Sequence, residues 1–247
     1  MGKVTSVKDI NVGGGRGLFD RFDSAGAKTG FADLGSLSAL TIQNANEYWE
    51  HFDSREGTQK KDLKVLIKTG ATMSAELDSA SDENLALFNM SRVNSVTQSA
   101  ETASTYEVTS VNQGRRYDVG RLKISNVSIP TFAEGTDFIT HAAEGHVEIV
   151  ESGGIADASS ITITYDAAEV TYSQIEMLSE KTIEGAFQWI SKQIHGERRK
   201  LEAPKVSITP GSNLGLLNIA EGQKIPLNIE ILASDTGAFA TFTTLPG

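Results

Sequence analysis

Apolar and polar residues alternate along most of the chain, in short segments that Gly, Pro, Asn or Asp mostly separate. Alternation with a period of two is typical of antiparallel β-strands that bury one face. Leu63, Val65 and Ile67 define such a face, which we expect to be buried. We predict strands in the segments SALTIQ, DLKVLIKTGATMSAEL, STYEVTSV, RLKISNVSI, GHVEIVES, SSITITYDA, TIEGAFQWIS, KVSITP and KIPLNIEIL.

One segment, SASDENLALFNM, predicts a short helix. Ser79 or Ser81 can cap its amino end, and two acidic residues follow where the helix dipole favours them. Leu85, Leu87 and Phe88 give it one apolar side, which should pack on a sheet. Many short strands with a single helix predict a mainly β fold, an antiparallel β-sandwich or barrel with a flanking short α-helix.

Two regions depart from this pattern. Residues 1–35 contain many glycines and no sustained hydrophobic period, so we predict an extended, irregular N-terminal arm followed by one β-sandwich domain over 36–247. The charged stretch from Gln43 to Lys61 predicts a connection between two strands that is much longer than an ordinary hairpin loop.

Aromatic side chains make this long hairpin loop unusual. Tyr48, Trp49 and Phe52 are costly to leave in water and are typical anchors of a protein interface, as is Arg55. His51 lies among acids and bases, but a general base needs a fixed and partly desolvated position, which a surface loop does not supply by itself. We therefore favour an interface over an active site.

Cysteine is absent from the 247 residues, which excludes disulfides, thiolate zinc sites and cysteine nucleophiles. The first residues contain no apolar run like that of a signal peptide, and no eighteen consecutive apolar residues occur. We expect a soluble chain, synthesised in the cytoplasm, with no membrane segment.

The formal net charge of -10, with a pI near 4.9, argues against a protein that grips nucleic acid by neutralising phosphates. The excess is local, because no Lys or Arg occurs from Ile124 to Glu180. This segment is either an ordinary solvated acidic face or an anionic surface that must not adsorb a polyanion. Its carboxylates are Glu134, Asp137, Glu144, Glu148, Glu151, Asp157, Asp166, Glu169, Glu176 and Glu180.

Known catalytic and ligand-binding patterns are weak in this sequence. NVGGGRG lacks the spacing of a phosphate-binding loop, and no serine lies in a nucleophile elbow. His141, His146 and Glu148 could be considered metal ligands, but the turn after His141 should separate it from the other two, so surface histidines are favoured. We predict no catalytic, cofactor-binding or metal-binding residues and no enzymatic activity.

The order of motifs from Leu34 to Met90 resembles the major tail tube proteins of tailed bacteriophages. The resemblance lies in a Leu-Gly turn, a charged hairpin with a Ser-Arg-x-Gly element and an Asn-Leu-Ala-bearing helix. The upstream GLFDRFDSAGAKTGFADLG is similar to that family's amino-terminal arm, and ISNVSI, EGTDFI and TIEGAFQWISKQIHGE are similar to its later strands. The matching positions are Leu34, Gly35, Ser54, Arg55, Gly57 and Glu83 to Leu87.

This resemblance implies a structural virion protein that forms hexameric rings, stacked into the tail tube through which genome DNA is ejected. It also implies tape measure, tail terminator and distal tail or baseplate proteins as partners. The arm and the hairpin would contact neighbouring subunits or rings, while residues 106–168 exceed a minimal tube sandwich. The expected contact residues are Tyr48, Trp49, Phe52, Arg55, Glu56, Lys60 and Lys61.

The acidic segment gains a use in such a tube. DNA carries one charge per about 1.7 Å of axis, so an anionic lumen would let it slide where a basic one would hold it. The candidate lumen-side acids are Glu134, Asp137, Glu144, Glu148, Glu151, Asp157, Asp166 and Glu169.

Two other functions remain as alternatives. One is a carbohydrate-binding or adhesion β-sandwich, and the other is a hydrolase with paired carboxylates.

Overall fold

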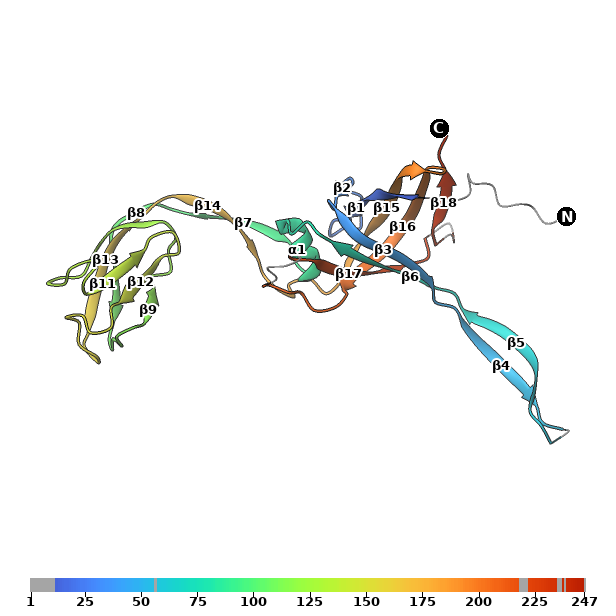
Figure 1. The fold of residues 1–247 in the computed structure, drawn as a ribbon, viewed down its shortest axis with the longest axis horizontal. Coiled ribbons are helices and arrows are strands. Elements are labelled where there is room, and N and C mark those ends of the chain that lie inside the picture. The colour runs from blue at the N-terminus through green and yellow to red at the C-terminus, as the bar shows by residue number, and fades with distance from the viewer. Residues whose placement is uncertain (1–11, 56, 218–221, 235–236, 238, 247) are drawn as a thin grey trace. The chain divides into compact units, whose positions relative to one another are not determined.

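The computed structural model describes residues 12–55, 57–217, 222–234, 237 and 239–246. The chain divides into two compact units (Figure 1). Unit 1 combines residues 1–93 with 175–247, and unit 2 is the inserted segment 94–174. Each unit has its own cluster of buried apolar side chains, so each is described by itself.

Unit 1 is built on one antiparallel sheet with the strand order β2-β1-β15-β16-β17-β6-β3, and β18 also pairs with β16. The mainly β, antiparallel prediction is confirmed. The barrel is not closed, because β3 is hydrogen-bonded to β6 and not to β1 among the described strands. The strands are β1 (Val12–Arg21), β2 (Ala32–Asp33), β3 (Leu37–Asn44), β6 (Ala71–Leu77), β15 (Ile183–His195), β16 (Arg199–Pro210), β17 (Ile225–Ile231) and β18 (Thr241–Thr244).

The predicted irregular arm is wrong for the part of it that forms β1. This strand lies inside the sheet and pairs with β15 along its whole length. Glycine is unfavourable in strands in general, but here it permits a close approach, since a Cβ at Gly15 would overlap the indole of Trp189. Residues 1–11 of the predicted arm lie outside the described residues.

The predicted helix is confirmed as α1 (Asp82–Phe88), with Ser81 as its N-cap. The backbone N–H of Asn84 donates to Ser81 Oγ at 3.2 Å, which satisfies one free amide of the first turn. The apolar side of α1 packs against β16 and β17, and Leu87 joins the buried cluster of unit 1.

The predicted long loop is a strand pair instead, β4 (Glu47–Asp53) with β5 (Lys60–Lys68), joined by a six-residue connection. The pairing of β3 with β6 continues into it, because Ala45 N donates to the carbonyl of Gly70 at 2.8 Å (Figure 1). The chain therefore re-enters the sheet at Ala71 and not at Asp62.

Unit 2 contains two three-stranded antiparallel sheets that share one buried cluster, which includes Val111, Phe138, Ile149 and Ile163. The predicted elaboration, residues 106–168, lies wholly within this unit. The first sheet has the order β10-β13-β8 and the second β11-β12-β9, while β7 pairs with β14. The strands are β7 (Val93–Gln98), β8 (Glu101–Val108), β9 (Arg116–Asp118), β10 (Ile124–Ser128), β11 (Phe138–His141), β12 (His146–Ile149), β13 (Ile161–Ala167) and β14 (Val170–Ile175).

Hydrogen bonds in unit 1 hold together the two chain segments between which unit 2 is inserted. Leu178 N donates to the carbonyl of Asn89, and Glu180 N to that of Met90, at 2.8 and 2.9 Å. Arg92 Nε lies 2.7 Å from Glu180 Oε1. We call the paired segments 89–92 and 178–180 the neck. Among the described residues, no helix is both long and apolar enough to cross a membrane.

Candidate interaction surface

Large apolar side chains are left exposed mainly in unit 1. Of sixteen such residues in the described part of the chain, fifteen belong to unit 1, and seven of these fifteen lie on the β4–β5 hairpin. A protein surface seldom leaves a dense apolar group uncovered unless it binds something. The seven are Tyr48, Trp49, Phe52, Leu63, Val65, Leu66 and Ile67.

Register divides the hairpin into two faces. Residues directly opposite each other in an antiparallel pair point to the same face. The register shifts between Glu47 and Tyr48 and again between His51 and Phe52, because one residue of β5 is left without a partner at each place. The tryptophan face consists of Glu47, Trp49, His51, Leu63, Val65 and Lys68, and the lysine face of Tyr48, Glu50, Phe52, Lys61, Lys64 and Leu66.

On the lysine face, cations cover the aromatic rings. Lys64 Nζ lies 3.9 Å from the centre of the Tyr48 ring, and Lys61 Nζ lies 5.6 Å from that of Phe52. Glu50 joins the two lysines, at 2.6 Å from Lys61 and 3.8 Å from Lys64. The hydrogen bond from Lys61 is the main cause that lowers the pKa of Glu50 below its ordinary value. This face is therefore already satisfied within one chain.

The tryptophan face has an apolar centre that nothing in the described chain covers. The exposed fractions of Trp49, Leu63 and Val65 are 50, 49 and 42%. Polar groups lie only at its margins. His51 Nδ1 is 2.6 Å from Asp62 Oδ1, and the hydrogen bond from Lys68 to Glu47 raises the pKa of Lys68. The expectation that Leu63 and Val65 are buried is wrong for a single copy of the chain.

The remaining predicted contact residues lie near the turn of the hairpin. Arg55 Nε is 3.0 Å from Asp53 Oδ2, and hydrogen bonds from the side chain and backbone of Arg55 lower the pKa of Asp53. Lys60 lies opposite Asp53 in the register. Glu56 lies outside the described residues. The described members of the predicted set thus lie on one hairpin, but the three aromatic residues are divided between its two faces.

Sequence reasoning missed the apolar residues of β5 as contact candidates. Leu63, Val65, Leu66 and Ile67 are all exposed, although the alternation of Leu63, Val65 and Ile67 predicts a buried face. Alternation identifies the face of a strand but does not say what covers it. The signal that could have found them is the high charge of the stretch before Asp62, because charges on both strands are difficult to bury inside one sheet.

All eight candidate lumen-side acids lie in unit 2. Several have local structural contacts. Asp137 accepts hydrogen bonds from the backbone N–H groups of Ala133 and Gly154, which lower its pKa. A hydrogen bond from the side chain of Asn126 is the main cause that lowers the pKa of Asp166, and a hydrogen bond from the backbone N–H of Ala103 lowers it further. Their orientation toward a lumen stays a prediction, because it depends on neighbouring copies.

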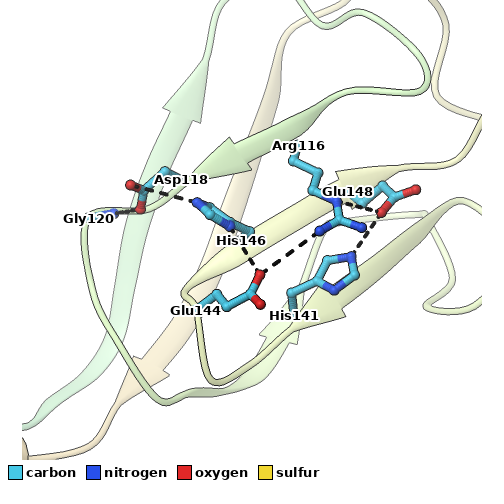
Figure 2. Close-up of polar contacts among 7 residues, drawn as sticks. All are labelled: Arg116, Asp118, Gly120, His141, Glu144, His146 and Glu148. Atoms are coloured by element: carbon cyan, nitrogen blue, oxygen red, sulfur yellow. Dashed lines mark hydrogen bonds and ion pairs between the residues drawn. The ribbon is translucent and has the colours of Figure 1, made fainter. Parts of the chain in front are cut away.

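The histidines of unit 2 form a polar cluster on the β9–β12–β11 sheet (Figure 2). The prediction that a turn separates His141 from Glu148 is wrong, because a tight hairpin places His141 Nε2 2.8 Å from Glu148 Oε2. This contact is the main cause that lowers the pKa of Glu148. Arg116 Nε also donates to Glu148 Oε2, at 2.9 Å.

His146 lies beside this cluster between two further acids. Its Nε2 is 3.8 Å from Asp118 Oδ2, and its Nδ1 is 3.6 Å from Glu144 Oε2 (Figure 2). The guanidinium of Arg116 lies between the carboxylates of Glu144 and Glu148 and offsets part of their negative charge. Within the described ranges, no three His, Asp or Glu side chains come together in a group that could hold a metal ion.

Comparison with known families adds a membership but no activity. A family model with the description "Protein of unknown function UCP028589" matches residues 11–242, and the chain therefore belongs to this family. No curated protein matches the chain.

Proposed function

We propose that the chain is a structural protein that assembles with copies of itself into stacked rings, as the tube of a bacteriophage tail. The observation that carries this proposal is the uncovered β4–β5 hairpin. A two-stranded ribbon has no core of its own and is marginally stable in water without further packing. Seven exposed large apolar side chains on such a ribbon therefore favour a covered position in an assembly.

The two faces suit different parts of a repeated contact. Apolar and aromatic anchors, such as Trp49, contribute most of the binding free energy of a typical interface, while charged groups at its rim set orientation. Glu50 forms ion pairs with Lys61 and Lys64, and Glu47 with Lys68, which offsets part of the positive charge of the hairpin. This arrangement supports self-assembly in a defined register.

The resemblance described above supports a tube in particular. The antiparallel sheet, the short helix α1 and the long hairpin are elements that this resemblance leads us to expect. On this proposal, six copies form each ring and the tube conducts double-stranded DNA in the virion tail. Tape measure, terminator and distal tail proteins are then its partners, and the acids of unit 2 either flank the lumen or form a solvated outer surface.

Electron microscopy of the purified protein tests the proposal. We expect hollow tubes or six-fold rings from the wild type. Replacing Tyr48, Trp49 and Phe52 with Ser should leave a folded subunit that no longer polymerises, because the apolar anchors of the hairpin are lost. Ile139→Ser is the matched control, since Ile139 is the one exposed large apolar residue of unit 2 in the described chain, and it should leave the tubes unchanged.

Two outcomes would contradict the proposal. Normal tubes from the triple serine variant would remove the hairpin from the interface. A wild-type protein that stays monomeric at high concentration and binds glycan arrays would favour the alternative carbohydrate-binding module.

A further inference from the structure

An apolar groove opens along the seam where the sheet of unit 1 fails to close. We call it the seam groove. Its volume is about 330 Å³, and on one side it is bounded by the backbone of Gly13, Gly14 and Gly15. The glycines add no side chain to the groove, and Trp189 of β15 occupies the position that a Cβ at Gly15 would take. The apolar lining includes Leu37, Leu40, Ile42, Met73, Trp189 and Phe242.

Exposure increases from the floor of the seam groove to its mouth. Met73 at the floor is 2% exposed, whereas Ile42 and Phe242 are 44 and 57% exposed. Among the residues that the structure describes, no ionisable side chain lines the groove. Its volume is at the lower end of the range for ligand pockets, which leaves room for an aromatic side chain but not for a whole strand. The groove is therefore suited to one large apolar side chain inserted from outside.

The same chain carries a side chain of this kind. Trp49 is half exposed at the centre of the tryptophan face, without the lysine cover that Tyr48 and Phe52 have. A tryptophan buries roughly 150–250 Å² when it is enclosed, which makes it the largest apolar contribution available on the hairpin. Its flanking neighbours Leu63 and Val65 can cover the rim of a groove that has no charges.

Trp49 cannot reach the seam groove of its own chain. It follows Ile42 by seven residues, and the hydrogen bond from Ala45 N to the carbonyl of Gly70 links the β3–β6 pair to the β4–β5 pair. At about 3.3 Å per residue, Trp49 lies roughly 23 Å beyond Ile42 along the ribbon. We call the Trp49 side chain the knob. The knob and the seam groove are complementary in size and polarity, but they lie too far apart on one chain to bind each other. Such a pair makes a heterologous contact that extends from copy to copy.

We propose that Trp49 of one copy docks in the seam groove of a second copy. This inference rests on the proposed function, because it assigns the partner of the hairpin as another copy of this chain. It also identifies acceptor residues, Ile42 and Phe242, that no sequence motif indicates as contact residues.

Two single substitutions separate the donor from the acceptor. Trp49→Ser removes the knob, and Ile42→Lys places a charge at the mouth of the groove, where it stays hydrated in the free subunit and is desolvated on docking. Gln43→Lys is the matched control, because Gln43 is exposed on the same strand, next to Ile42 and therefore on the opposite face, and it is not among the residues that line the groove. We expect loss of tubes from the first two variants and normal tubes from the control.

Mixing the two inactive variants gives the decisive result. The Ile42→Lys subunit keeps its knob and the Trp49→Ser subunit keeps its groove, so one intact contact forms between them. Sedimentation velocity should show a species of twice the subunit mass in the mixture, and neither variant alone should form it. A chain that carries both substitutions should not form it either, with itself or in any mixture.

The outcomes distinguish this inference from the proposed function. If wild-type tubes form and Ile42→Lys also forms them, the docking is wrong and the tube proposal stands. If the wild type forms no tubes but the mixture forms the dimeric species, the docking stands and the tube proposal is wrong. A mixture that sediments as monomers would overturn the docking in either case.

Discussion

The two units of this chain differ in their exposed apolar residues and in their net charge. Unit 1 is about twice as long as unit 2, yet it holds fifteen of the sixteen exposed large apolar residues found in the described chain. Unit 2 holds eleven carboxylates against four Lys and Arg, a net charge of -7, which is most of the -10 of the whole chain. The surface of unit 2 is therefore suited to contact with water, whereas the exposed apolar residues of unit 1 favour contact with another molecule.

The separate buried clusters make this contrast testable, and the largest effect should come from a cavity in either one. Phe187 in unit 1 and Phe138 in unit 2 are both fully enclosed. Phe187→Ala and Phe138→Ala should each cost about 3–5 kcal/mol of unfolding free energy, through lost burial and the cavity left behind. Scanning calorimetry should show two transitions, with each variant lowering only its own.

The paired variants are controls for each other. If either substitution shifted both transitions equally, the units would unfold as one body, and the comparison between them would lose its basis.

Removing unit 2 should have a smaller effect. The neck already holds residues 89–92 against 178–180 without any residue of unit 2. Replacing residues 94–174 by a four-residue Gly-Ser turn should leave unit 1 folded and able to form tubes. The stability of unit 1 should change by no more than the loop-closure free energy, about 2–3 kcal/mol. Chemical denaturation and electron microscopy would measure both; aggregated or tube-free protein would contradict a self-sufficient unit 1.

Acid should weaken unit 2 more than the sheet of unit 1, and this is the smallest expected effect. The pKa values of Asp137, Glu148 and Asp166 are lowered by hydrogen bonds in the fold. Their contribution to stability is therefore complete above the unfolded pKa values, about 4, and is lost as pH falls through the lower folded values. The transition of unit 2 should fall more than that of unit 1 between pH 6 and pH 3.

Asp137→Asn provides the control for this titration, because it removes one of the three titrating groups and should reduce the difference. Equal shifts of the two transitions with pH would show that these hydrogen bonds do not stabilise unit 2 selectively.

Periodicity predicted much of the fold, because a strand with one buried face shows an alternation of apolar and polar residues in its own sequence. It located the segments that became β6, β13 and β17, and it found α1 together with its cap at Ser81. It missed β1, because the glycines there are explained only by Trp189, far away in the sequence. It also missed β4, in which aromatic and charged residues occupy both faces.

The candidate surface was predicted only in part, for a related reason. Tyr48, Trp49 and Phe52 attracted attention as aromatics on a charged stretch. Once β4 is a strand, alternation alone places Trp49 on the face opposite Tyr48 and Phe52, but the lysine cover of those two rings depends on Lys61 and Lys64 across the pair. The seam groove depends on strands from both ends of the chain. Neither the lysine cover nor the seam groove can be derived from the spacing of residues within one segment, because both depend on which strands pair.

The neck has a consequence for engineering. It brings the two ends of an 81-residue insertion together on unit 1, so the parent sheet sees only two adjacent attachment points. A different domain whose termini lie close together could be grafted there in place of unit 2. On a polymer of this chain, such a cargo would be displayed once per subunit at a regular repeat.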